Sequence, residues 1–211
     1  MQPQIPQGQY PMSTSNSNMH PAFFLKNYLV RKKIFSFLGS AFHIYDQNGQ
    51  VVFYSKQKAF KLREDIRIYT GEDMQTEVLL IKARNIIDFS AVYDVFDPRT
   101  NQKVGALKRQ GMASIVQDKW SILNTNDQEI GMIQEESLVL GLIRRFVTNL
   151  IPQTYLGTIN NAPVCEFKQN FNPFVVKINL DFSQDTNNWL DRRLGIAAAI
   201  LLCAIEGKQA G

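Results

Sequence analysis

The chain has 211 residues, of which 45% are apolar and 20% are charged, and its formal net charge is +4. This length and composition fit one globular domain with a sizeable core, with or without a tail. Two cysteines are too few for a disulfide scaffold, and the composition excludes collagen-like, coiled-coil and wholly disordered chains. The mildly basic balance favours an anionic partner without identifying one.

The first 22 residues differ in composition from the rest of the chain. They contain no Asp, Glu, Lys or Arg, hold four of the eight prolines, and include a Ser/Asn-rich run from Ser13 to Asn18. Such a segment cannot bury enough apolar surface to offset the entropy lost on ordering. We therefore predict a disordered tail over residues 1–22, dispensable for folding, and one domain over residues 23–211. A proline-dependent docking motif at Pro3 and Pro6 is the alternative role for the tail.

Alternating apolar residues predict a series of strands along the domain. The clearest hairpin signal is Asn48-Gly49, which lies between two alternating runs, one with Phe42 and Ile44 and the other with Val51 and Phe53. Further strands are predicted at Leu25–Val30, Ile66–Ile68, Val78–Ile81, Val92–Phe96, Val104–Leu107, Trp120–Leu123, Ile130–Ile133, Tyr155–Ile159, Val164–Phe167 and Val175–Leu180. The count is therefore about twelve strands, most of them joined by short turns.

Two of these hairpins match residue by residue. Asn101-Gln-Lys-Val-Gly105-Ala-Leu107 precedes Asp127-Gln-Glu-Ile-Gly131-Met-Ile133 by 26 positions. Repeated hairpins form either a solenoid-like array or one closed antiparallel sheet. Because the units vary in length, and because closure removes exposed edges, the pattern favours a barrel.

The C-terminal segment Leu194–Ile205 has no polar side chain and is rich in Ala and Leu, which predicts a helix that ends before Gly207. A helix that is apolar on all sides is buried in a core or in a membrane. Twelve residues span about 18 Å, whereas the hydrocarbon of a bilayer is about 30 Å thick, so a core helix is favoured. The predicted fold class is mainly β: an antiparallel closed barrel of about twelve strands around a central apolar C-terminal helix.

Three segments carry a family resemblance: Trp120–Gly131, Ile133–Ser137 and Asp191–Glu206. Through them the chain resembles the Tubby C-terminal-like superfamily, most closely its LURP-one-related and phospholipid-scramblase-like branches. The resemblance covers roughly residues 24–208 and implies a twelve-stranded barrel wrapped around a central C-terminal helix. This agrees with the prediction made from the residues, but a shared fold does not establish a shared function.

The sequence offers few groups for catalysis. Its two histidines are His20, in the predicted tail, and His43, in a predicted strand, while Cys165 and Cys203 fall in different elements. Clustered metal ligands, a nucleophile elbow, a Walker loop and a dinucleotide fingerprint do not occur in the sequence. We therefore predict that the protein is not an enzyme, that His43 lies on a strand face, and that both cysteines are buried.

Pairs of basic residues are candidates for binding phosphate groups. The predicted lipid- or anion-binding residues are Lys108, Arg109, Arg144 and Arg145, and further basic clusters occur at Arg31–Lys33 and Lys56–Arg63. Lys108 and Arg109 are adjacent on a strand and so face opposite sides of the sheet. Arg144 and Arg145 flank an apolar helical stripe in Leu138–Leu150, which fits a membrane interface or, alternatively, a helix that plugs the barrel end. A solvated surface is the alternative for all these residues.

The polar stretch before the final helix is a candidate cation site, because scramblase relatives carry a calcium-binding segment there. The candidate ligands are Asp185, Asn187 and Asp191. Aligned as an EF-hand-like loop from Asp181, the segment has Thr186 at the glycine position and Arg192 at the glutamate position. The alternative is a capped helix start, in which Asp191 stabilises the positive end of the helix dipole. No other cofactor is predicted.

These observations favour a non-catalytic barrel that associates with anionic phospholipid or a membrane surface, as Tubby relatives bind phosphoinositides. Scramblase-like activity would in addition require membrane insertion of the last helix or its neighbours. The rival hypothesis is a soluble scaffold that binds a protein partner. Nucleic-acid binding is not predicted, because no basic stripe is interleaved with aromatic residues. The expected location is cytoplasmic, with peripheral membrane attachment where lipid is bound, and the oligomeric state is left open.

Overall fold

The computed structural model describes residues 19–35, 39–57, 65–87, 90–110, 119–136, 153–170 and 175–206. The elements within these ranges are the 3-10 helix η2 (Pro21–Phe24), the strands β1 (Asn27–Phe35), β2 (Gly39–Tyr45), β3 (Val51–Gln57), β4 (Ile66–Tyr69), β5 (Glu77–Ile87), β6 (Ser90–Asp97), β7 (Gln102–Arg109), β8 (Lys119–Leu123), β9 (Glu129–Glu135), β10 (Gln153–Ile159), β11 (Ala162–Asn170) and β12 (Val175–Asp181), and the helix α2 (Arg192–Glu206).

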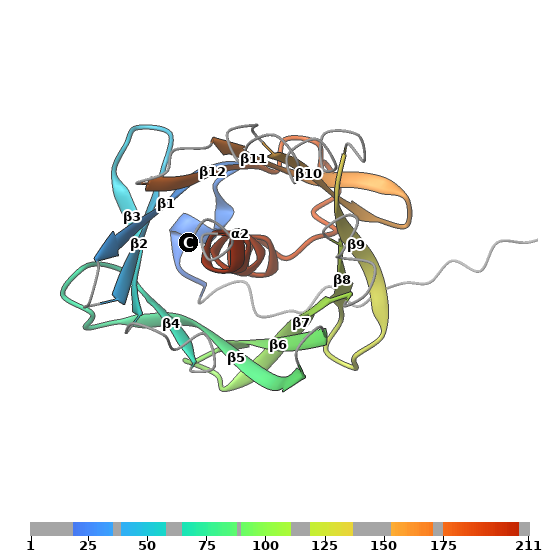
Figure 1. The fold of residues 1–211 in the computed structure, drawn as a ribbon, viewed down its shortest axis with the longest axis horizontal. Coiled ribbons are helices and arrows are strands. Elements are labelled where there is room, and N and C mark those ends of the chain that lie inside the picture. Colours follow the sequence, from blue (N-terminus) through green and yellow to red (C-terminus); the bar gives the residue numbers. More distant parts are fainter. Residues whose placement is uncertain are drawn as a thin grey trace, which may run out of the picture.

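The strands form a closed antiparallel barrel, in which each strand pairs with its sequence neighbours and β1 pairs with β12 (Figure 1). Side chains alternate between the interior and the outer wall. On β4, for example, Ile66 and Ile68 are buried while Arg67 between them is exposed. Each predicted strand overlaps an observed one, so the predicted fold class is confirmed.

The two ends of the barrel differ. Because neighbouring strands run in opposite directions, the short turns at residues 46–50, 70–76, 97–101, 124–128 and 160–161 all lie at the end where β1 begins. The start of α2 lies at this end too, where Arg193 forms an ion pair with Asp97 at the end of β6, at 3.0 Å. We call this the hairpin end. At the opposite end, the strands are connected through residues outside the described ranges.

The sequence repeat marks two equivalent turns at the hairpin end. Asn101 and Asp127 both have positive φ, of 53° and 62°, which Asn and Asp tolerate better than most residues. Four residues later, Gly105 and Gly131 allow a close approach of the next strand. A Cβ on Gly105 would lie 2.5 Å from a backbone oxygen of β8, and one on Gly131 would lie 2.1 Å from a backbone oxygen of β10. The repeat therefore encodes turn geometry followed by close strand packing.

The helix α2 runs through the interior of the barrel (Figure 1). Its residues from Leu194 to Ala204 are all buried, which explains why the segment has no polar side chain. Gly195 lets the helix pack against the Phe182 ring, because a Cβ there would lie 2.3 Å from a ring carbon. Within the described residues, no helix is long and apolar enough to cross a bilayer.

Lys32 is an interior residue, although it belongs to the basic cluster Arg31–Lys33. It points inward from β1 and is 6% exposed. Its Nζ donates hydrogen bonds to the carbonyl oxygens of Cys203 (3.1 Å) and Ala204 (3.3 Å) near the end of α2. The lysine thus places a cation beside carbonyl groups at the negative end of the helix.

Both cysteines are buried in the barrel interior, as predicted. Burial raises the pKa of Cys165 well above its ordinary value and raises the pKa of Cys203 to about 12. Both groups are therefore protonated thiols at neutral pH, and they act as small apolar side chains in the core.

The packed part of the chain begins earlier than the predicted boundary at Phe23. Ala22 is buried beside Phe23, and the Tyr28 hydroxyl donates a 2.6 Å hydrogen bond to the Ala22 carbonyl oxygen. The His20 ring accepts a hydrogen bond from the Ala22 amide at the start of η2. Residues 20–22 therefore pack against the barrel, although the prediction placed them in the tail of residues 1–22. Residues 1–18 of the predicted tail lie outside the described residues.

A chain that begins at Met19 is expected to melt at the temperature of the full chain, whereas one that begins at Lys26 is expected to melt about 10 °C lower. The shorter chain loses Phe23, whose ring stacks on Phe53 at a centroid distance of 4.6 Å. Deleting a buried Phe removes about 3–5 kcal/mol, and each kcal/mol shifts the melting temperature by about 2–4 °C. Thermal melts followed by circular dichroism measure the melting temperatures of the two shortened chains and of the full chain. A lower melting temperature for the chain from Met19 would show that residues 1–18 contribute to the fold.

Candidate functional site

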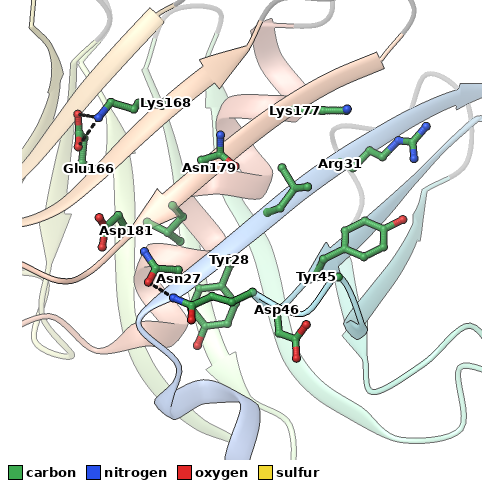
Figure 2. Close-up of a pocket in the computed structure, with 14 residues that line it drawn as sticks. Asn27, Tyr28, Arg31, Tyr45, Asp46, Glu166, Lys168, Lys177, Asn179 and Asp181 are labelled. Atoms are coloured by element: carbon green, nitrogen blue, oxygen red, sulfur yellow. Dashed lines mark hydrogen bonds and ion pairs between the residues drawn. The ribbon is translucent and has the colours of Figure 1, made fainter.

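A groove of about 760 Å³ crosses the outer wall of the barrel over β2, β1, β12 and β11 (Figure 2). Its volume lies in the range of small-ligand sites. The side chains that line it come mainly from the outward positions of the four strands, so strand register fixes their arrangement. We call this site the outer groove.

Register arranges the lining side chains in three rows. From the hairpin end these rows are Asn27, Asp181 and Glu166; then Tyr45, Leu29, Asn179 and Lys168; and then Arg31 and Lys177. Two residues along a strand separate neighbouring rows, which corresponds to about 6–7 Å. The outer two rows are therefore about 13 Å apart.

The row farthest from the hairpin end is basic. Arg31 on β1 and Lys177 on β12 are direct cross-strand partners, and like charges in that position repel. Within the described part of the chain, neither side chain forms an ion pair, and Nε of Arg31 is buried without a hydrogen-bond partner. An anion bound between the two cations would offset their repulsion.

The opposite end of the groove is acidic. Asp46 and Asp181 lie there, on the side away from Arg31 and Lys177 (Figure 2). Partial burial of Asp181 opposes its ionisation, but hydrogen bonds from Ser183 and Asn27 outweigh burial and lower the pKa of this carboxyl. Asp181 is therefore ionised at neutral pH.

The remaining charges of the outer groove neutralise each other. Nζ of Lys168 lies 2.9 Å from Oε1 of Glu166, two residues away on β11. This pair leaves two cations at one end of the groove and two carboxylates at the other. Its middle row offers the Leu29 side chain, the Asn179 amide and the Tyr45 ring.

His43 on β2 is the cross-strand partner of Arg31. Its Nε2 lies 2.9 Å from Oε1 of Glu72, and its ring meets the Tyr54 ring edge-on at a centroid distance of 5.1 Å. The prediction that His43 is a strand-face residue is confirmed. It is 6% exposed, covered by tyrosines on the outer wall.

The basic residues predicted from sequence do not come together in the outer groove. Lys108 is exposed on the outer face of β7, on a different part of the barrel wall from β1 (Figure 1). Arg109 lies on the other face of that strand, near the core residue Tyr93, so the predicted opposite orientation is confirmed. Arg144, Arg145 and the segment Leu138–Leu150 lie outside the described residues.

The carboxylates predicted as calcium ligands bind the chain's own donors. Asp185 is buried and accepts hydrogen bonds from the backbone amides of Trp189 (2.8 Å) and Leu190 (3.1 Å), and Nη1 of Arg192 lies 2.7 Å from it. Asp191 caps α2 by accepting a hydrogen bond from the Arg193 amide.

Asn187, the third predicted ligand, is exposed. Among the residues that the structure describes, no group of three or more His, Cys, Asp or Glu side chains could hold a metal ion. The contacts of Asp185 and Asp191 correspond to the capped helix start that the sequence left as the alternative.

Comparison with known proteins places the chain in a family. A model of the LURP-one-related family matches residues 51–198, a span from β3 into α2 that covers more than half of the chain. An X-ray structure of a protein from Arabidopsis thaliana is similar to this chain, with 13% sequence identity and a TM-score of 0.49 over 88% of this chain and 95% of that one. Among curated proteins, none matches the chain. The resemblance predicted from the sequence is confirmed, and the chain belongs to the LURP-one-related family.

Proposed function

We propose that this barrel is a non-catalytic module that binds anionic phospholipid headgroups in the outer groove. The observation that carries the proposal is the cross-strand pair of Arg31 and Lys177, which has no acidic partner within the described residues. A phosphate group between them would replace repulsion with attraction, and the Arg guanidinium can hold two phosphate oxygens at once.

The surroundings of this pair support a headgroup rather than a free ion as the ligand. The groove is large enough for an organic headgroup, and Leu29 and Tyr45 offer contacts to its carbon atoms. Lys33 follows Arg31 on the same face of β1 and is half-buried. Each basic residue near an anionic lipid surface contributes about 1 kcal/mol to attachment.

The test is flotation of the full chain with liposomes of neutral lipid, alone or mixed with phosphatidylserine or a phosphoinositide. An Arg31→Glu/Lys177→Glu variant is expected to lose most of its recovery with anionic liposomes, because both cations become anions. A Lys82→Glu/Lys108→Glu variant makes the same change in net charge at exposed positions outside the groove and should keep its recovery. Recovery of the unaltered chain should fall as salt is raised.

The outcomes distinguish the groove from the sites predicted by sequence. A loss confined to Lys82→Glu/Lys108→Glu would move the site to β7, and a loss confined to Arg144→Glu/Arg145→Glu would move it to that segment. Equal recovery of the unaltered chain on neutral and anionic liposomes would contradict headgroup binding altogether.

A protein-binding scaffold is the second candidate function, and two side chains near the hairpin end favour it. Phe24 is 55% exposed and Trp189 is 46% exposed, which is high for large apolar residues. Exposed apolar side chains are frequent in protein interfaces. Absence of binding to any liposome at low salt would make this scaffold function the preferred one.

A further inference from the structure

We infer that, among anionic headgroups, the outer groove selects those that carry an ammonium group beside the phosphate, as phosphatidylserine does. The inference rests on the proposed function and concerns the acidic end of the same groove. Headgroup binding through Arg31 and Lys177 alone would not distinguish one anionic lipid from another.

The charges of the groove are complementary to a ligand with both signs of charge. Arg31 and Lys177 lie at one end and Asp46 and Asp181 at the other, while Glu166 and Lys168 on β11 pair with each other (Figure 2). If the ligand carried only phosphate, the two carboxylates would weaken its binding, because they repel any anion that enters the groove. An ammonium group in the ligand turns that repulsion into attraction.

Both carboxylates are held in place by hydrogen bonds within the chain, and both add negative charge to this end of the groove. Oδ1 of Asp46 accepts hydrogen bonds from the backbone amides of Asn48 and Gln50, at 2.9 and 2.8 Å, so the turn at 46–50 fixes its position. Oδ2 has one long contact, 3.5 Å from the Asn48 side chain. Asp181 is ionised at neutral pH, as its lowered pKa indicates.

The row spacing suits a serine headgroup. If the phosphate lies at Arg31 and Lys177, an ammonium group a few ångströms away lies over the middle row, next to the Tyr45 ring. The face of a tyrosine ring attracts a cation. The row that contains Asp181 lies about 6–7 Å from the middle row, toward the hairpin end. The serine carboxylate adds a second anionic group for the two basic side chains. Phosphatidylglycerol has the same net charge but no ammonium group. Its headgroup is therefore repelled by the acidic end of the groove and gains no attraction there.

The experiment compares flotation of the full chain with liposomes that contain equal mole fractions of phosphatidylserine or phosphatidylglycerol in neutral lipid. We expect several-fold higher recovery with phosphatidylserine. An Asp46→Asn/Asp181→Asn variant should lose this preference, because its recovery with phosphatidylserine falls while that with phosphatidylglycerol is unchanged or higher. Asn keeps an acceptor oxygen for the backbone hydrogen bonds, and a thermal melt verifies the fold of the variant.

Asp73→Asn is the matched control, since Asp73 also accepts a backbone hydrogen bond in an exposed turn but lies outside the groove. It should keep the preference. Soluble O-phospho-L-serine should release the chain from phosphatidylserine liposomes at lower concentration than glycerol phosphate does. A higher apparent affinity for the liposomes than for soluble phosphoserine would identify the lipid as the source of the headgroup.

Different results would contradict the selectivity for phosphatidylserine and the binding of headgroups itself. Equal recovery with phosphatidylserine and phosphatidylglycerol, or an unchanged preference in Asp46→Asn/Asp181→Asn, overturns the selectivity and leaves headgroup binding in place. Absence of recovery with both lipids overturns headgroup binding itself.

Discussion

Replacing Leu201 with Asp is expected to unfold the domain. Leu201 is fully buried on α2 within the barrel. A carboxylate there either remains charged in an apolar interior or takes up a proton, and both destabilise the fold by several kcal/mol. The lost leucine packing adds about 2–5 kcal/mol, and a typical domain has only about 5–15 kcal/mol of stability in total. Soluble yield and circular dichroism should show loss of the folded protein.

The matched control introduces the same charge at an exposed apolar residue. Met74 is 41% exposed in the turn between β4 and β5 and has a φ of 53°, which Asp tolerates well. Met74→Asp should therefore melt near the unaltered chain. Leu201→Ala, which adds no charge, should remain folded with a stability lower by about 2–5 kcal/mol. A Leu201→Asp variant that melts cooperatively at the original temperature would show that α2 is not part of the core.

Local sequence patterns predicted most of the fold, because in a barrel the side chains of each strand alternate between the interior and the outer wall. An outward residue must follow an inward one, so alternation such as Ile66-Arg67-Ile68 is visible without knowledge of any partner strand. The central helix was equally visible, since a segment enclosed on all sides contains no polar face. Closure followed from the unequal lengths of the hairpin units, which disfavour a regular array, and from the instability of exposed edges.

Residues that depend on tertiary contacts were missed or assigned differently. Lys32 was grouped with Arg31 and Lys33 as a surface cluster, although it shares a strand face with Tyr28 and Val30, both buried. That alternation was the sequence signal for an inward-pointing Lys32. The contact of Lys32 with the last carbonyl groups of α2 could not be predicted, because it depends on how the helix lies in the barrel.

The outer groove could not be read from the sequence. Arg31 and Lys177 lie in the first and last strands, and only closure of the barrel makes them direct partners. The sequence instead drew attention to Lys108 and Arg109, which are adjacent in the chain. On a strand, adjacent residues point to opposite faces, so sequence adjacency is a poor guide to a basic surface there.

Replacing Asp185 with Ala is expected to lower the free energy of unfolding by about 3–5 kcal/mol, the typical effect of removing one partner of a buried ion pair. The Asp185 side chain is almost fully buried, and its carboxylate holds two backbone amides and Arg192 in the turn that leads into α2. Without it, the guanidinium of Arg192 remains largely buried over the Phe182 ring with fewer acceptors. Asp191→Ala, which removes a helix cap, is the comparison and should lower stability by about 1 kcal/mol.

The same variants decide between a structural and a calcium-binding role for this turn. If the carboxylates serve the chain's own donors, the melting temperature of the unaltered chain should be equal in calcium and in chelator. A calcium site would instead stabilise the fold by about 2.7 kcal/mol at a free concentration 100 times its dissociation constant. Calcium would then raise the melting temperature by several degrees, and Asp185→Ala would abolish that rise. Because Arg192 already places a cation 2.7 Å from Oδ2 of Asp185, a second cation at this carboxylate would be repelled, and we expect no effect of calcium.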